Sequence, residues 1–288
     1  GNSLDLKYRT GGLEIFANYG WWRGNTRFDR LNDMYTTTSK GTYRQFVSTI
    51  GKESYNDMTG KLGFSYMIND LHSIGAYYQN SWNRHNTDGT IPSEIWQDGI
   101  LLDLYNSDVH NQSTAVPRHY ANIYYNGIVG KLNIDFNADY IWYKSRELTF
   151  NNELSEMGND REVNTSSINH NRMFAEKLVM TYPLWKGQIE IGEEYTNTRT
   201  TNLFSANIPE TPNADNRVDE NNIAVFAELG QQFGHFMIGA GLRYEHVKFN
   251  YYEMGLLRDG QSKTYNNIFP SLNIATQVGK VRMGLNYT

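Results

Sequence analysis

The chain has 288 residues, of which 39% are hydrophobic and 20% are charged, with a net charge of −5 and no cysteine. The length allows one large domain or two ordinary ones. The modest negative charge argues against a nucleic-acid partner, and the absence of cysteine excludes disulfides and thiolate metal sites. No stretch approaches the ~18 consecutive apolar residues that a membrane-spanning helix needs. This test does not exclude a spanning sheet, because only every second residue of such a strand faces lipid.

The first predicted hairpin joins the strands Leu4–Tyr8 and Leu13–Trp21 through a tight turn at Thr10–Gly12. In both strands apolar residues occupy every second position, and the residues between them are mostly polar. A period of two places the two sets on opposite faces of a strand. A long polar loop is expected to follow, from about Arg23 to Asn56.

Five further hairpins with short turns are predicted, most of them with the same alternation. Their strands are Leu62–Ile68 with Ile74–Trp82, Ala121–Val129 with Leu132–Trp142, Phe174–Tyr182 with Ile189–Tyr195, Ile223–Leu229 with Ile238–Tyr244, and Ile268–Ile274 with Val281–Tyr287. The polar loops expected between them are His85–Pro117, Ser145–Asn169, Thr201–Asp219 and Tyr251–Lys263. Glu176 and Glu193 fall in phase with the apolar residues and fit a lipid-facing surface poorly.

The clearest of these strands runs from Leu132 to Trp142, where every second residue is apolar or aromatic. The residues between them include Asn133, Asp135, Asn137 and Asp139. This second face is too polar for the interior of a β-sandwich. It suits a water-filled lumen, while the first face suits lipid with an aromatic collar at its end.

Short turns and long loops alternate strictly along the chain, six short and five long. Outer-membrane barrels have short turns on the periplasmic side and long loops outside. The predicted fold class is therefore all-β, an antiparallel up-and-down transmembrane β-barrel of which about twelve strands are present. Because the chain begins and ends within predicted strands, we expect residues 1–288 to be one segment of a larger barrel, cut at both ends and without a signal peptide.

The segment Asn266–Tyr287 contains Phe269-Pro270-Ser271-Leu272, a short turn, and a strand that ends in Leu285-Asn286-Tyr287. It resembles the late barrel hairpin of TonB-dependent outer-membrane receptors, in particular the outer membrane protein beta-barrel family of Bacteroides-like bacteria. The segment Asn2–Arg9 resembles an earlier strand of the same barrel. In the family an Arg-Pro segment follows the position of Tyr287, and this chain ends before it.

The resemblance implies a barrel of about 22 strands with a plugged lumen. It also implies active uptake, in which a nutrient such as a siderophore, glycan or peptide binds the outer loops and the plug. TonB, driven by the proton gradient of the inner membrane, then pulls on a TonB box. The plug domain and the TonB box are absent from this chain, so we expect it not to couple transport by itself. The expected location is the Gram-negative outer membrane, with its lipid as a partner.

Two kinds of candidate metal ligand occur in the sequence. The seven histidines show no pair with metal spacing on one face, and we expect ordinary surface histidines, with His72 and His235 in short turns and His85, His110 and His170 in loops. Acidic residues cluster in two predicted loops, at Asp215, Asp219 and Glu220 and at Glu153, Glu156, Asp160 and Glu162. Carboxylates bind Ca²⁺, but neither cluster has an EF-hand pattern, and solvated loops are the simpler interpretation.

No serine lies in a Gly-x-Ser-x-Gly elbow, and nothing in the sequence fixes a nucleophile. We therefore predict no catalytic residue, no cofactor, no metal site and no enzymatic activity. The tyrosine pairs Tyr77–Tyr78, Tyr124–Tyr125 and Tyr251–Tyr252 are expected to place one ring toward lipid and one toward the lumen, as an aromatic collar more than as a ligand platform. The charged residues of the lumen face are expected to pair with one another or with a plug: Asp5, Arg9, Asp135, Asp139, Arg243, Glu245 and Arg282.

The function predicted from the sequence is nutrient import by the barrel of a TonB-dependent receptor, with the ligand-binding residues unknown. One alternative is a passive, porin-like barrel. Another is a soluble β-sandwich binding domain, for which both faces of Leu132–Trp142 would be covered by protein. If no further strands are present, we expect either an incomplete or curled sheet with unpaired edges that are prone to association, or closure through a partner chain.

Overall fold

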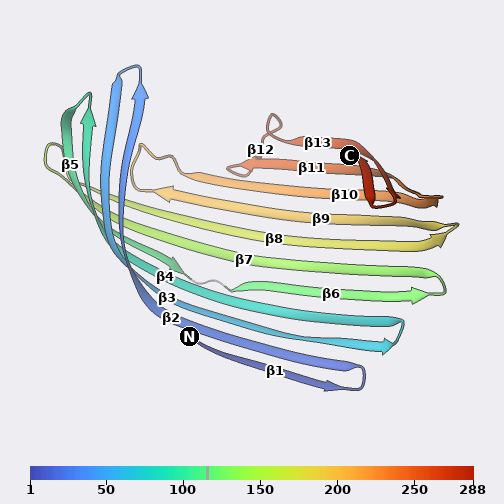
Figure 1. The fold of residues 1–288 in the computed structure, drawn as a ribbon. Coiled ribbons are helices and arrows are strands. Elements are labelled where there is room, and N and C mark those ends of the chain that lie inside the picture. The colour runs from blue at the N-terminus through green and yellow to red at the C-terminus, as the bar shows by residue number, and fades with distance from the viewer. Residues whose placement is uncertain (115–116) are drawn as a thin grey trace.

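The structure is a computed structural model that describes residues 1–114 and 117–288. In these residues fourteen antiparallel strands form one sheet (Figure 1). The sheet is a single curled layer, and no second sheet among the described residues packs on either face. No helix in the described part of the chain is long and apolar enough to cross a membrane.

The strands follow the chain in order around the sheet, and every pairing between neighbours is antiparallel. Their bounds are β1 (Asn2–Thr10), β2 (Leu13–Thr38), β3 (Gly41–Asn69), β4 (His72–Gln97), β5 (Ile100–Thr114), β6 (Arg118–Val129), β7 (Leu132–Ser155), β8 (Arg161–Leu184), β9 (Gly187–Ala206), β10 (Ala214–Phe233), β11 (Phe236–Glu253), β12 (Leu256–Leu257), β13 (Lys263–Val278) and β14 (Val281–Tyr287).

Strands β5 and β6 share one position in the sheet. Both pair with β4 on one side and with β7 on the other, β5 along the far part of these strands and β6 along the part next to the short turns. Strand β12 is a two-residue pairing on β11. In the described residues the continuous path across the sheet therefore has twelve positions, which confirms the strand number predicted from the sequence.

All six predicted short turns are present, and each consists of two residues. They lie at Gly11–Gly12, Asp70–Leu71, Gly130–Lys131, Trp185–Lys186, Gly234–His235 and Gly279–Lys280. The first turn residue has a positive φ in five of them, 53° at Gly11 and 60° at Gly234 for example. Glycine reaches this conformation without a steric cost, which explains why it occupies four of these positions.

The prediction of long loops is mostly wrong, because β-hairpins continue through these segments. Strands β2 and β3 pair without interruption from Leu13–Tyr66 to Thr38–Gly41, so only Ser39 and Lys40 connect them. The other far connections are 98–99, 156–160, 207–213 and 254–262, and residues 115–116 of the predicted loop His85–Pro117 lie outside the described residues. A two-stranded ladder satisfies its backbone groups whatever the side-chain pattern, so these polar segments remain paired.

The register keeps the apolar residues of neighbouring strands on one face. Directly paired residues point to the same side of a sheet. One such row crosses seven strands and consists of Tyr8, Ile15, Phe64, Ala76, Ile123, Ala138 and Glu176. We call this the outer face, and the opposite, mostly polar side the inner face.

The sheet has almost no conventional core. Among the described residues only Val47, Ala138 and Ala224 are buried hydrophobic side chains. A soluble sandwich would bury one apolar face against a second sheet. The single layer therefore contradicts the β-sandwich alternative, and β7 has neither face covered by a second layer of the described chain.

The sheet is open in the described residues, with β1 at one edge and β14 at the other. Neither edge strand pairs with a second strand of the described chain. This agrees with the curled sheet with unpaired edges expected from the sequence.

Candidate functional site: a lipid-facing belt and a polar inner face

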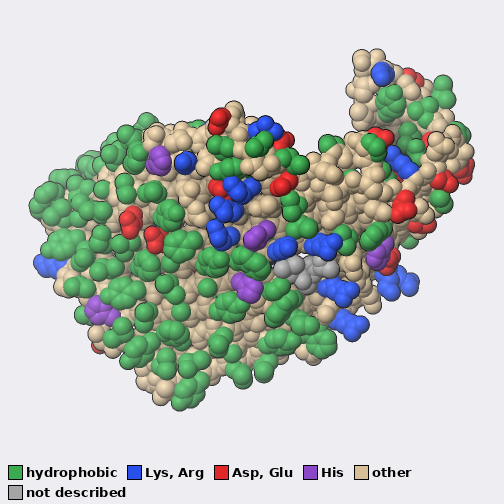
Figure 2. Space-filling view, turned by 180° about the vertical axis from the view of Figure 1, so that it is seen from behind, with side chains coloured by type: hydrophobic (Ala, Val, Ile, Leu, Met, Phe, Trp, Pro, Cys, Tyr) green, Lys and Arg blue, Asp and Glu red, His purple; other side chains and the backbone are tan. Residues whose placement is uncertain are grey.

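The outer face carries a broad belt of exposed apolar side chains between the short turns and the middle of the long strands. Figure 2 shows hydrophobic side chains gathered over this part of the molecule. Exposed members on the first seven strands include Leu4, Leu6, Tyr8, Ile15, Tyr19, Leu62, Phe64, Tyr66, Ile74, Tyr78, Ile123 and Tyr140. Contiguous apolar surfaces of this extent mark contact with a membrane or another protein.

The belt has the height expected for a bilayer. On β7 it runs from Leu132 at the short turn to Trp142, which is the ~9–11 residues of a tilted spanning strand. Trp21, Trp82 and Trp142 occupy the outer face at the far end of the belt on β2, β4 and β7. Aromatic side chains of this kind mark the membrane boundary, and we call these three residues the border tryptophans.

Polar contacts tie the aromatic border to its neighbours. Trp21 Nε1 donates a hydrogen bond to Asn56 Oδ1 at 2.7 Å, and the ring of His119 lies 5.1 Å from that of Trp142. Two of the three tyrosine pairs lie within the belt and place one ring on each face, as predicted. Tyr78 and Tyr125 lie on the outer face, while Tyr77 and Tyr124 lie on the inner face. The third pair, Tyr251 and Tyr252, lies beyond the belt near the far end of β11.

Glu176 and Glu193 do lie on the outer face, as the sequence suggested. Glu176 is half-buried and pairs in register with Ala138 and Tyr195. Glu193 is exposed and lies between Leu178 and Val225, at the rim of a shallow, mainly apolar groove of about 450 Å³. The belt is therefore interrupted at these two positions on β8 and β9.

Two separate networks of polar side chains lie on the inner face. In the first, Tyr120 donates a hydrogen bond to Asp139 at 2.6 Å, and Tyr77 donates to Tyr120 at 3.1 Å. The ammonium of Lys61 lies 3.9 Å from the centre of the Tyr77 ring, which is cation–π geometry. Asn122 also donates to Asp139, at 2.7 Å, so this carboxylate accepts from two side chains.

The second inner-face group is an ion-pair cluster on β8, β9 and β11. Glu194 accepts from Lys177 at 2.7 Å and from Arg243 at 2.6 Å, and Arg243 also contacts Glu245 at 2.6 Å. Both cations lie within 6 Å of the Phe226 ring. The lumen charges named from the sequence thus mostly pair with neighbours, but the sequence did not single out Glu194 or Lys177.

The remaining charges of that set follow the same rule. Arg9 and Lys7 both pair with Glu14, Asn18 donates to Asp5, and Arg282 donates to Gln277 at 3.0 Å. The side-chain amide of Asn126 lies beside Asp135. None of these contacts involves three or more ligands suited to a metal, and no such group occurs among the described residues.

The histidines predicted to lie in loops lie in strands instead. His85 is in β4, His110 in β5 and His170 in β8, because the hairpins extend beyond the belt. His85 Nδ1 contacts Glu53 at 2.7 Å and its Nε2 contacts Asp57 at 3.0 Å. Burial alone would lower the pKa of His85, but the hydrogen bonds with Glu53 and Asp57 raise it above its ordinary value.

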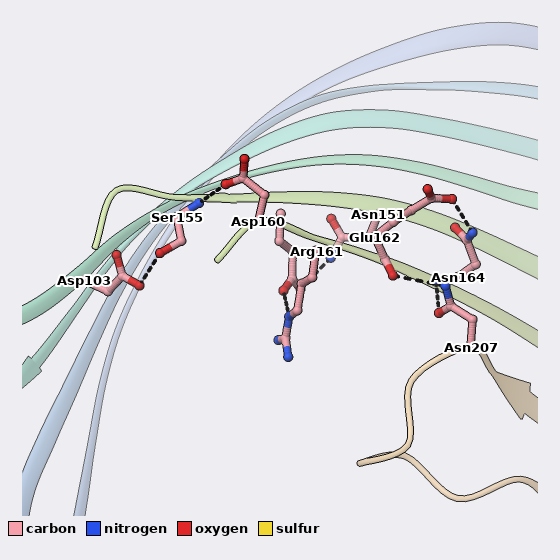
Figure 3. Close-up of polar contacts among 9 residues, drawn as sticks. Asp103, Asn151, Ser155, Asp160, Arg161, Glu162, Asn164 and Asn207 are labelled. Carbon is pink, nitrogen blue, oxygen red and sulfur yellow. Dashed lines mark hydrogen bonds and ion pairs between the residues drawn. The ribbon is translucent and has the colours of Figure 1, made fainter. Parts of the chain in front are cut away.

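The far ends of the hairpins are joined by a polar cluster that the sequence did not reveal (Figure 3). Asp103 is buried and accepts hydrogen bonds from Ser155 Oγ at 2.6 Å and from the backbone of Met157 at 3.1 Å. The hydrogen bond from Ser155 lowers the pKa of Asp103 below its usual range. An aspartate inside the apolar run Ile100–Leu104 was the only sequence signal for this contact.

The same region separates the acidic residues that the sequence grouped together. Asp160 accepts from the backbone of Ser155 at 3.0 Å (Figure 3). Glu153 pairs with Arg161. In the other cluster Asp219 pairs with Arg199, while Glu220 points to the opposite face of β10. The prediction of acidic loops is therefore wrong for Glu153 in β7, Glu162 in β8 and the three acidic residues of β10, and only Glu156 and Asp160 lie in a connection.

A single-layer antiparallel sheet, with an apolar outer face, a polar inner face, tight turns at one end and long hairpins at the other, defines an outer-membrane β-barrel protein. The chain belongs to the outer membrane protein beta-barrel family, whose model matches residues 129–288. Its location is the outer membrane of a Gram-negative bacterium. No curated protein matches the chain.

Three solved structures resemble the chain at low sequence identity. The unliganded ferric citrate transporter FecA is 12% identical, with a TM-score of 0.51 over 99% of this chain and 42% of FecA. The copper transporter OprC is 12% identical, with a TM-score of 0.49 over 98% of this chain and 46% of OprC. The outer membrane protease OmpT from Escherichia coli is 13% identical, with a TM-score of 0.32 over 96% of both chains. The chain thus spans less than half the length of the two transporters, and the FecA likeness establishes the fold alone.

Proposed function

We propose that the chain forms part of the barrel wall of a TonB-dependent receptor, which imports a nutrient across the outer membrane. The observation that carries this proposal is the open wall of twelve positions, which matches 42% of the FecA chain and nearly all of this one. FecA is itself a transporter of ferric citrate. The ligand of the present protein is assigned only to the class of scarce nutrients: a siderophore, glycan, peptide or similar compound.

The open edges support a wall that continues beyond the described strands. Unpaired N–H and C=O groups in hydrocarbon each cost several kcal/mol. In the membrane, β1 and β14 therefore need partners, which further strands of a larger barrel would supply. The paired charges of the inner face suit a surface in contact with a plug domain or with water.

The proposal assigns the chain no catalytic step. Several inner-face carboxylates are engaged by donors, as Asp139 is by Tyr120 and Asn122. Import would draw its energy from TonB, with a plug domain as the mobile element. Incubation of the purified protein with casein and with ester substrates is expected to give no turnover.

Transport can be distinguished from passive diffusion in two assays. In cells, uptake of labelled siderophores, oligosaccharides and peptides would be compared with and without the gene, each in the presence and absence of TonB. We expect at least one compound whose uptake needs both. In planar bilayers, the intact protein is expected to show no stable open-channel conductance.

The opposite result identifies a porin-like barrel. Uptake that needs the gene but not TonB, together with steady conductance steps, would replace the receptor proposal with passive diffusion. The polar inner face alone is compatible with a water-filled pore. The two assays therefore test the plug and the energy coupling, which the wall does not contain.

A further inference from the structure

Basic side chains gather on the outer face just beyond the border tryptophans. On β2, β4 and β7 the next residue on the outer face beyond the border tryptophan, on the side away from the short turns, is basic. These residues are Arg23 after Trp21, Arg84 after Trp82, and Lys144 after Trp142. Successive outward positions on a strand are two residues apart, or roughly 6–7 Å. These cations therefore lie at the height of the lipid headgroups.

The basic positions continue across the sheet. Arg172 lies on β8 directly opposite Trp142, and Arg199 lies on β9 opposite Arg172. We call Arg23, Arg84, Lys144, Arg146, Arg172, Arg199 and Arg217 the basic belt. Figure 2 shows Lys and Arg side chains along the boundary between the hydrophobic field and the projecting hairpins.

Arg23 and Arg84 form the best-defined part of this belt. Asn56 on β3 is directly paired with Arg23 on β2 and with Arg84 on β4. The two arginines therefore lie on either side of β3, on the same face of the sheet. With Asn25, Ser54 and Asn86 they line a hollow of about 440 Å³. The carbonyl oxygen Oδ1 of Asn86 is buried without a hydrogen-bond partner.

The two arginines differ from Arg199 and Arg243 in their surroundings. Arg199 and Arg243 each contact a carboxylate at 2.6 Å. Among the described residues neither Arg23 nor Arg84 has an ion-pair partner, although both are exposed. Two like charges in one hollow repel each other, and an anion between them would relieve that repulsion.

We propose that this hollow binds a phosphate-bearing headgroup of an outer-leaflet lipid. Guanidinium groups bind phosphate oxygens with paired hydrogen bonds, and the side-chain amide groups beside them supply further donors. The apolar belt below Trp21 and Trp82 would hold the acyl chains of the same molecule. A soluble phosphate would gain nothing from that apolar surface, so the position of the hollow selects a lipid. This inference does not depend on TonB-driven transport.

The test uses the purified protein in detergent and diphosphorylated lipid A as the probe, with bound lipid counted by native mass spectrometry. The variant is Arg23→Gln with Arg84→Gln. The matched control is Arg27→Gln with Lys52→Gln, which removes two cations that pair directly across the same hairpin but lie farther from the border. We expect the first variant to weaken lipid binding at least about tenfold, which corresponds to ~1.4 kcal/mol, and the control to bind like the wild type.

Three further measurements make the result decisive. Arg23→Lys with Arg84→Lys keeps both charges and is expected to retain part of the binding, and a heat-shift gel checks that every variant is folded. Equal binding by the Gln variant and the wild type, or an equal loss in the control, would overturn the proposal. Displacement of the lipid by inorganic phosphate at the same phosphate concentration would instead assign the hollow to free anions and also overturn it.

Discussion

Arg243 Nη2 lies 2.6 Å from Glu194 Oε2, although 49 residues and an intervening strand separate the two. The pair passes over Ala224 on β10, which is 1% exposed and is the register partner of both Glu194 and Glu245. A small side chain at this position leaves room for the ion pair above it. A side-chain contact that spans β10 thus links β9 to β11 on the inner face, in addition to the backbone hydrogen bonds between neighbouring strands.

Removing this arginine should destabilise the sheet. Arg243→Met leaves Glu194 and Glu245 facing each other with only Lys177 nearby, and hydrogen bonds to charged groups contribute about 1.5–3 kcal/mol each. We expect a loss of that size in the free energy of unfolding, measured by urea titration in detergent. Arg282→Met is the matched control, because Arg282 is exposed and donates a hydrogen bond to the neutral side chain of Gln277. Equal losses in the two variants would show that the cluster adds nothing specific.

Gly192 on β9 should tolerate no side chain. A Cβ at this position would collide with the Phe226 ring and come within 2.8 Å of the Leu178 carbonyl oxygen. Overpacking of this kind costs about 1–3 kcal/mol, so Gly192→Ala should lower the unfolding midpoint in urea. Gly60→Ala is the control, since nothing lies within 4 Å of a Cβ there. A neutral Gly192→Ala would mean that Phe226 moves aside without cost.

The two faces of β8 should respond oppositely to a lysine. Leu178 lies on the outer face beside Phe136 and Glu193, whereas Val179 lies on the inner face opposite Asp135. A cation on the lipid face costs about 2–4 kcal/mol at the bilayer midplane. Leu178→Lys should therefore lose most of its folded fraction in lipid vesicles on a heat-shift gel, while Val179→Lys folds. If both variants fold equally well, the assignment of the faces on β8 is wrong.

The contacts around His85 should depend on pH. Its folded-state pKa is raised, so its contribution to stability is complete below the ordinary pKa of about 6.5 and is lost as the pH rises through the raised value. We expect the amides of β3 and β4 near Tyr55 and His85 to lose protection from hydrogen exchange over that interval, after correction for intrinsic rates. His85→Gln should abolish this dependence, while His235→Gln, in a short turn, should leave it unchanged. A wild-type profile identical to that of His85→Gln would contradict the role of the Glu53 and Asp57 contacts.

The parts of the fold that rest on period-two patterns could be predicted from the sequence. Leu132–Trp142 alternates so clearly that its two faces follow directly, and glycines at positions such as Gly11 and Gly130 mark the short turns. The long hairpins could not be predicted in this way. Beyond Trp21, the residues of β2 are mixed on both faces, and the strand persists because its backbone pairs fully with β3.

The contacts between residues far apart in the chain could not be predicted from the sequence either. Glu194 and Arg243 meet only because the register of β9, β10 and β11 places them diagonally, and a one-residue shift would turn them to opposite faces. Asp103 and Ser155 likewise lie 52 residues apart at the ends of different hairpins. Side-chain pattern determines which face a residue occupies, while strand register determines which neighbours it has.

The β2–β3 hairpin gives experimental access to the cell exterior. From Trp21 to Thr38 the strand advances 17 positions, or roughly 55 Å if fully extended, and its tip consists only of Ser39 and Lys40. Exposed hairpin tips accept insertions readily. A peptide epitope placed between Ser39 and Lys40 would stand well clear of the bilayer, so antibody could label living bacteria and report directly on how much of this protein reaches the surface.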